Sequence, residues 1–62
     1  MTTIFNYDHP NPKEKVYLKV SEHMVCSKGD KITIDNEIYI VGKTILDPKR
    51  EVFLVFLTDK CN

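Results

Sequence analysis

The sequence lacks alanine and tryptophan, and it contains only one arginine and two glycines among its 62 residues. Alanine has the highest helix propensity of all residues, so its absence argues against a helical domain. Six isoleucines, six valines and five threonines are present instead, and β-branched residues favour strands. The composition therefore predicts an all-β protein.

Long apolar runs and an excess of one charge are also lacking. The longest apolar run, Val52 to Leu57, is far shorter than the ~20 residues that span a bilayer, and the first residues lack the pattern of a signal peptide. Nine lysines and arginines balance nine acidic residues, so the basic excess of a dedicated nucleic-acid binder is missing. We therefore expect a cytoplasmic protein without a membrane partner, and a chain this short predicts one domain over residues 1–62.

Residues encoded by AT-rich codons, such as isoleucine, lysine and asparagine, are abundant, whereas residues encoded by GC-rich codons are scarce. Met1 is followed directly by the domain, as in a complete short gene. Both features are typical of phages and mobile elements. We therefore expect a phage-type protein that acts in the cytoplasm of a host.

Turn residues divide the chain into strand-length segments. Residues 1–12 predict a short edge strand and then a loop, because Pro10 and Pro12 remove backbone donors. From Lys15 onward apolar and polar residues alternate, as in a half-buried strand. The segment from Ser21 to Cys26 fits either a single helical turn or a continuation of this strand. Three further strands are expected, over residues 31–34, 37–46 and 51–58.

The hairpin between the strands expected over residues 31–34 and 37–46 has a predictable register. A two-residue loop at Asp35 and Asn36 pairs Ile34 with Glu37 and places Tyr39 on the same face as Ile34. A three-residue loop would require left-handed geometry at Glu37, which is costly for a residue other than glycine. We therefore expect the shorter loop.

The last two predicted strands are apolar on both faces, so one face packs on the core and the other requires a cover. Gly42 lies inside the longer strand, and a glycine at such a place commonly marks a bulge or a barrel corner. Residues 28–34 and 38–41 also resemble the "Gly-Asp, strand, tight turn, strand" core of SH3-like small barrels. The resemblance implies a five-stranded barrel that is used mostly for binding. We expect an antiparallel meander of four to five strands, closed or half-closed as an SH3-like small barrel.

Catalytic and metal-binding patterns are weak. The potential zinc ligands His9, His23, Cys26 and Cys61 do not form two closely spaced pairs, and two cysteines in a cytoplasmic protein are expected to be reduced thiols. His23 and Cys26 would face each other on a helix but lie on opposite faces of a strand, and the weak helical signal of this segment argues against a nucleophile and base pair there. We therefore expect no metal, no cofactor and no enzymatic activity.

The surplus apolar strand surface predicts an interaction module that binds a protein partner or a second copy of itself. Tyr39, Phe53 and Phe56 are the candidate contact residues. Phe53 and Phe56 point to opposite faces of a regular strand, so one belongs to the core and only the other can anchor an interface. A phage accessory protein that modulates a host or viral protein would fit this role.

A weak nucleic-acid-binding barrel is the alternative. Lys15, Tyr17 and Lys19 share one face of the first alternating strand, where an aromatic ring can stack on a base and lysines can contact phosphates. The folded surface distinguishes the two functions, because a continuous basic stripe favours nucleic acid and a bare apolar patch favours protein.

Overall fold

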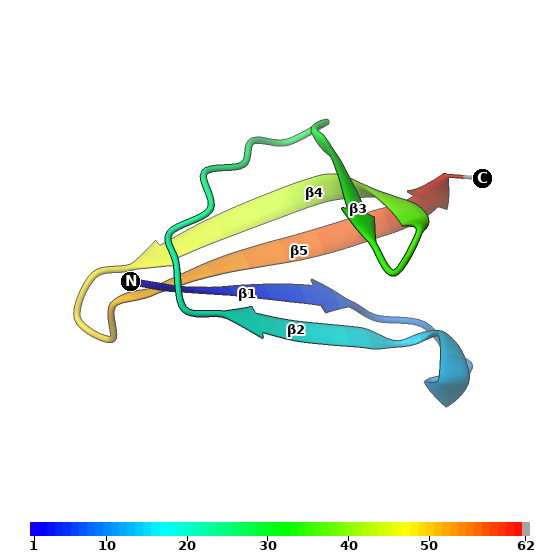
Figure 1. Ribbon diagram of the computed structural model, residues 1–62, viewed down its shortest axis with the longest axis horizontal. Helices are drawn as coiled ribbons and strands as arrows, with labels where there is room; N and C mark the ends of the chain where they lie inside the picture. The colour runs from blue at the N-terminus through cyan, green and yellow to red at the C-terminus, as the bar shows by residue number, and fades with distance from the viewer. Residues whose placement is uncertain (62) are drawn as a thin grey trace.

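The computed structural model describes residues 1–61, which form five strands and one short 3-10 helix (Figure 1). The elements are β1 (Thr2–Tyr7), η1 (Pro12–Glu14), β2 (Val16–Val20), β3 (Lys31–Ile34), β4 (Glu37–Asp47) and β5 (Val52–Cys61). The all-β prediction is confirmed. Within the described residues, no helix has the length and apolar character that crossing a membrane requires.

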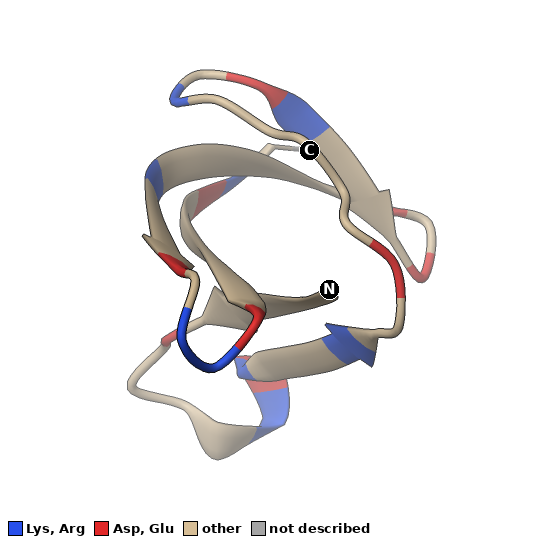
Figure 2. Cartoon of the chain, turned by 90° about the vertical axis from the view of Figure 1, so that its left-hand side faces the viewer, with Lys and Arg blue, Asp and Glu red and all other residues tan. Residues whose placement is uncertain are grey.

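The five strands form one sheet in the order β2-β1-β5-β4-β3. β3, β4 and β5 are an antiparallel meander, and β1 pairs antiparallel with β2. The pair β1 and β5 is parallel, so the sheet is mixed rather than antiparallel throughout. The sheet curls into a half-barrel whose two edges are β2 and β3 (Figure 2). The expected half-closed small barrel is therefore present, whereas its SH3-like family membership stays a prediction.

The prediction of an edge strand within residues 1–12 was wrong about its position. β1 lies inside the sheet, between β2 and β5, and the loop with its prolines follows it. Its residues alternate between buried and half-buried, with Thr3, Phe5 and Tyr7 facing the core. The amide of Thr2 also donates to the carbonyl of Glu51, which places the start of β1 beside the start of β5. This pairing depends on residues far apart in sequence, so no local pattern indicates it.

The hairpin between β3 and β4 has the predicted two-residue loop. Asp35 and Asn36 adopt φ angles of +50° and +67°, as the favoured tight hairpin turn requires. Ile34 pairs with Glu37, and Tyr39 is buried on the same side of the sheet as Ile34. The register prediction is confirmed.

Gly42 marks the predicted irregularity in β4. The pairing with β5 shifts on both sides of Val41, so Gly42 and Thr58 fall outside the regular register. The first half of β4 pairs with both β3 and β5, whereas the second half pairs with β5 alone. A bulge increases the local twist of a strand, and here it lies where the sheet turns toward β3.

The core fills the concave side of the half-barrel, which we call the inner face. Its buried residues are Thr3, Phe5, Tyr7, Ile34, Tyr39, Val41, Phe53, Val55 and Leu57. Burying such side chains contributes about 1.5–3 kcal/mol for each large apolar residue.

An irregular segment over residues 21–30 crosses the inner face, so neither the helical turn nor the strand expected from Ser21 to Cys26 forms. The hydroxyl of Thr3 holds the segment: it donates to the Glu22 carbonyl at 2.7 Å and accepts from the Met24 amide at 2.9 Å. These two bonds satisfy backbone groups that a helix would pair within itself and a strand would pair with its neighbour.

We predict that Gly42→Ala lowers the free energy of unfolding by about 1–3 kcal/mol, as overpacking does elsewhere. The added Cβ would overlap Cγ2 of Thr58 and lie 3.0 Å from Cβ of Thr58. Urea unfolding followed by circular dichroism measures the loss.

Thr58→Ser removes the overlapping methyl group and serves as the control. The double variant should regain most of the lost stability. An unchanged urea midpoint for Gly42→Ala alone would contradict this account of the bulge.

Candidate functional site

The three residues predicted to contact a protein partner divide between the two faces of the sheet. Tyr39 and Phe53 are only 4% and 8% exposed and belong to the core. Phe56 is half-buried on the convex side of β5, which we call the outer face. Phe53 and Phe56 therefore point to opposite faces, as the alternation of the strand predicts. Of the three, only Phe56 can anchor an interface on the folded protein.

The outer face brings Phe56 together with Tyr17, which the sequence assigned to a different function. Tyr17 pairs with Asn6 in the register of β2 and β1, Asn6 pairs with Phe56, and Phe56 pairs with Lys43. Directly paired residues place their side chains on the same face of a sheet. These four side chains form what we call the aromatic row: Tyr17, Asn6, Phe56 and Lys43.

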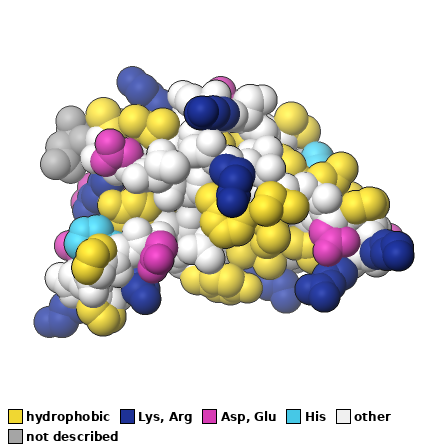
Figure 3. All heavy atoms as spheres, turned by 180° about the vertical axis from the view of Figure 1, so that it is seen from behind, with side chains coloured by type: hydrophobic (Ala, Val, Ile, Leu, Met, Phe, Trp, Pro, Cys, Tyr) yellow, Lys and Arg dark blue, Asp and Glu magenta, His cyan; other side chains and the backbone are white. Residues whose placement is uncertain are grey.

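A second row lies beside the first across the same four strands. By the same registers it consists of Lys19, Ile4, Leu54 and Ile45, and we call it the aliphatic row. Ile45 is 42% exposed and Tyr17 in the neighbouring row is 68% exposed, so both rows reach solvent. Figure 3, which views the molecule from behind, shows hydrophobic side chains gathered over the middle of the sheet with basic side chains among them.

Sequence reasoning missed several members of these two rows. Ile4 and Asn6 were assigned to an edge strand, so no contact of theirs with Phe56 or Tyr17 was expected. No local pattern in the sequence indicates that Lys43 contacts Phe56. In the structure its ammonium lies over the ring of Phe56, 5.1 Å from the ring centroid.

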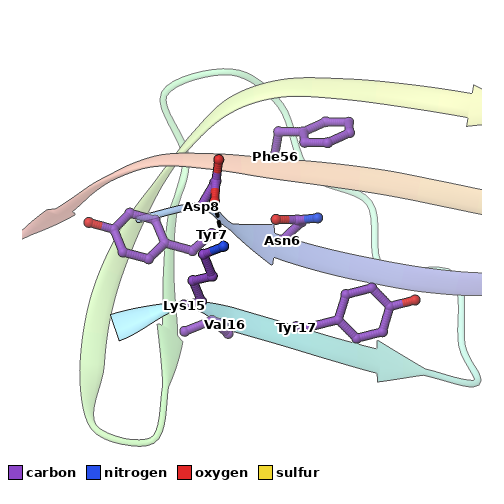
Figure 4. A pocket seen from close by; sticks show the side chains of 7 residues that line it. All are labelled: Asn6, Tyr7, Asp8, Lys15, Val16, Tyr17 and Phe56. Carbon is purple, nitrogen blue, oxygen red and sulfur yellow. Dashed lines mark ion pairs between the residues drawn. The ribbon is translucent and has the colours of Figure 1, made fainter. Parts of the chain in front are cut away.

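A hollow of about 450 Å³ opens at one end of the aromatic row. Tyr17, Asn6 and Phe56 follow one another across it from β2 to β5 (Figure 4). Asp8 and Lys15 also line it, with an ion pair of 3.6 Å between Lys15 Nζ and Asp8 Oδ1. Lys15 therefore lines the same hollow as Tyr17, but it is paired with a carboxylate, and Lys19 does not line this hollow.

Charges on the folded surface are mixed. Figure 2 shows lysine, arginine and acidic residues interspersed along the chain. The aromatic and aliphatic rows differ from this mixed distribution of charge, because they contain Lys19 and Lys43 and no carboxylate. Asp8 and Asp47 lie beyond them, at opposite ends of the outer face. The surface is thus neither a basic stripe nor a bare apolar patch.

The potential metal ligands of the sequence do not come together. Within the described residues, no three histidine, cysteine or acidic side chains gather as a metal site requires. Nδ1 of His23 lies 2.9 Å from the thioether of Met1, and its ring lies against Phe53 with centroids 5.1 Å apart. Cys61 lies at the end of β5 and Cys26 in the irregular segment, both as free thiols.

Cys26 is not activated as a nucleophile. Burial and, secondarily, the nearby carboxylate of Asp30 raise the pKa of its thiol. Its Sγ donates to the carbonyl of Met24 at 3.4 Å. A raised pKa reduces the thiolate fraction at neutral pH, and the thiolate is the reactive form.

A second hollow, of about 340 Å³, opens on the inner side at the gap in the half-barrel. Its walls come from β1, the irregular segment and β3, and they include Phe5, Val25, Cys26 and Ile32. Asp30 and Lys31 also line it, beside the Cys26 thiol whose pKa is raised.

Comparisons with protein-family models, with curated proteins and with solved structures find no match to this chain.

We predict that Cys26 reacts slowly with iodoacetamide at neutral pH and faster as the pH rises through its elevated pKa. Asp30→Asn should accelerate the reaction at neutral pH, because it removes a negative charge that disfavours the thiolate. The amide oxygen of the new side chain can still accept the hydrogen bond from the Ser27 amide.

Mass spectrometry of labelled peptides measures Cys26 and Cys61 separately. A Cys26 rate at neutral pH equal to that of free cysteine would contradict the prediction.

Proposed function

We propose that this protein is a non-catalytic interaction module that binds its partner through the outer face. The observation that supports this function is the pair of solvent-accessible rows on the outer face, in which aromatic and aliphatic side chains from four strands are adjacent. A chain of this size needs only one apolar face for its core, and exposed apolar surface in small proteins commonly marks an interaction site.

Two partner classes fit such a face. Another protein chain, including a second copy of this one, would bury the aliphatic row and Phe56. This is the role of a small accessory protein of the phage type, and an SH3-like barrel would be a suitable scaffold for it. A nucleic-acid strand would stack on Tyr17 and Phe56, and the lysines beside these rings support it as the second candidate.

Site-specific photo-crosslinking tests the binding role for both classes. A benzophenone amino acid replaces Ile45 on the outer face or, as the control, Val25, which is 80% exposed on the inner side. We expect the Ile45 probe alone to capture a macromolecule in a lysate of the source organism. Excess unlabelled protein should compete for this capture, whereas excess Phe56→Lys protein should not. Equal capture at both positions, or none at Ile45, would contradict the proposed function.

The two phenylalanines of β5 provide a matched pair of variants. Phe53→Lys should unfold the protein, because it places a charge in the core. Phe56→Lys should leave the fold intact, because Phe56 is half-buried on the opposite face. Circular dichroism measures folding, and sedimentation equilibrium measures whether a second copy binds through Phe56. Two unfolded variants would show that the outer face is required for stability and would count against its role as a free binding surface.

A further inference from the structure

We infer that the outer face binds a single-stranded nucleic acid, with one base inserted between Tyr17 and Phe56. This inference rests on the proposed binding role of the outer face and selects one of its two partner classes. It is carried by three features: the spacing of the two rings, the residue between them and the charge of the two rows.

The spacing of the rings suits a flat aromatic ligand. Tyr17 and Phe56 lie on β2 and β5, which are separated by one strand, so their backbones are about 10 Å apart. A ring stacked between two others needs about 7 Å between the outer planes, at roughly 3.5 Å for each contact. Side chains that lean toward each other can meet this distance. Lys43 reaches the ring of Phe56 from β4, whereas the hollow lies on the side of β1 and β2.

Asn6 lies between the two rings (Figure 4). Its amide offers both a donor and an acceptor, which is what the edge of a nucleobase presents in return. An aliphatic protein side chain in the same place would leave this amide without a partner. The amide of Asn6 therefore places hydrogen-bonding groups in the middle of the aromatic row, where the edge of an inserted base would lie.

The charge of the two rows favours an anionic partner. Lys19 and Lys43 lie on β2 and β4, at opposite ends of their rows, and neither row contains a carboxylate. A strand whose base occupies the hollow has phosphates within reach of such flanking lysines. A second copy docked by the same two rows would add the same lysines, and the carboxylates of Asp8 and Asp47 lie beyond these rows, at the ends of the outer face. The charges of the two rows therefore favour nucleic acid over self-association.

Duplexes should not bind in this way, because their bases are already stacked and paired. The inference is thus specific to unpaired strands, DNA or RNA, since the rings and lysines contact features that both share.

Fluorescence anisotropy with labelled oligothymidylate and oligouridylate of about 12 nucleotides tests the inference. A duplex of equal length is the control for unpaired bases. We expect both single strands to bind and the duplex to bind much more weakly. The ratio of the two single-strand affinities shows whether DNA or RNA is preferred.

Stacking is tested by Tyr17→Leu and Phe56→Leu, which keep an apolar side chain and remove the ring. Each should weaken single-strand binding roughly 5- to 150-fold, the range typical of losing one stacked base. Tyr17→Phe keeps the ring and should bind nearly as well as the unmodified protein. Tyr17 is mostly exposed, so its variants should fold, and circular dichroism verifies this.

The lysines are tested by the salt dependence of binding. For single strands the slope of log affinity against log salt is about −0.7 for each phosphate contact, so Lys19→Gln with Lys43→Gln should reduce it by about 1.4. Lys28→Gln with Lys31→Gln is the matched control, because both are exposed lysines of the irregular segment and the start of β3. This control changes the net charge equally and should leave the slope unchanged.

Four results would overturn the inference. Equal weakening by both lysine pairs would indicate non-specific attraction, and full binding by Tyr17→Leu and Phe56→Leu would exclude stacking. Absence of single-strand binding together with a protein captured at Ile45, or a dimer dissociated by Phe56→Lys, would exclude nucleic acid but leave the proposed binding role intact. Absence of both oligonucleotide binding and capture at Ile45 would exclude the proposed function as well.

Discussion

The central position of β5 determines both faces of the sheet. β5 pairs with β4 on one side and with β1 on the other, so its backbone is hydrogen-bonded along both edges. Its side chains therefore point alternately to the inner face and to the outer face. Phe53, Val55 and Leu57 build the core, whereas Val52, Leu54 and Phe56 lie outside. The candidate binding surface is thus a direct result of the arrangement that stabilises the fold.

The outer face depends equally on the parallel pairing of β1 with β5. This pairing inserts Ile4 and Asn6 between the residues of β2 and those of β5. If β1 lay at an edge, Tyr17 and Phe56 would not be separated by a single strand. On the other side, the bulge at Gly42 separates the part of β4 that supplies Lys43 and Ile45 from the part that pairs with β3. The position of β1 and the bulge at Gly42 thus determine the width of the outer face.

Features encoded within a few neighbouring residues could be predicted from the sequence. The loop at Asp35 and Asn36, the irregularity at Gly42 and the opposite orientations of Phe53 and Phe56 follow from local geometry and strand alternation. The position of β1 could not be predicted, because its pairing with β5 joins residues about fifty positions apart. For this reason the sequence indicated two separate candidate sites, one with Tyr17 and its lysines and one with Phe56. The long-range pairing of β1 with β5 places both on the outer face.

The parallel pair also affects the order of folding. β1 comes first in the described chain, yet it cannot complete its hydrogen bonding until β5 lies beside it. Because β4 also pairs with β5, the β1–β2 and β3–β4 hairpins are the strand pairs of the described residues that can form without β5, and isolated two-stranded hairpins are marginal in water. The aromatic side chains of the early strands therefore remain accessible, to chaperones for example, until β5 has joined the sheet.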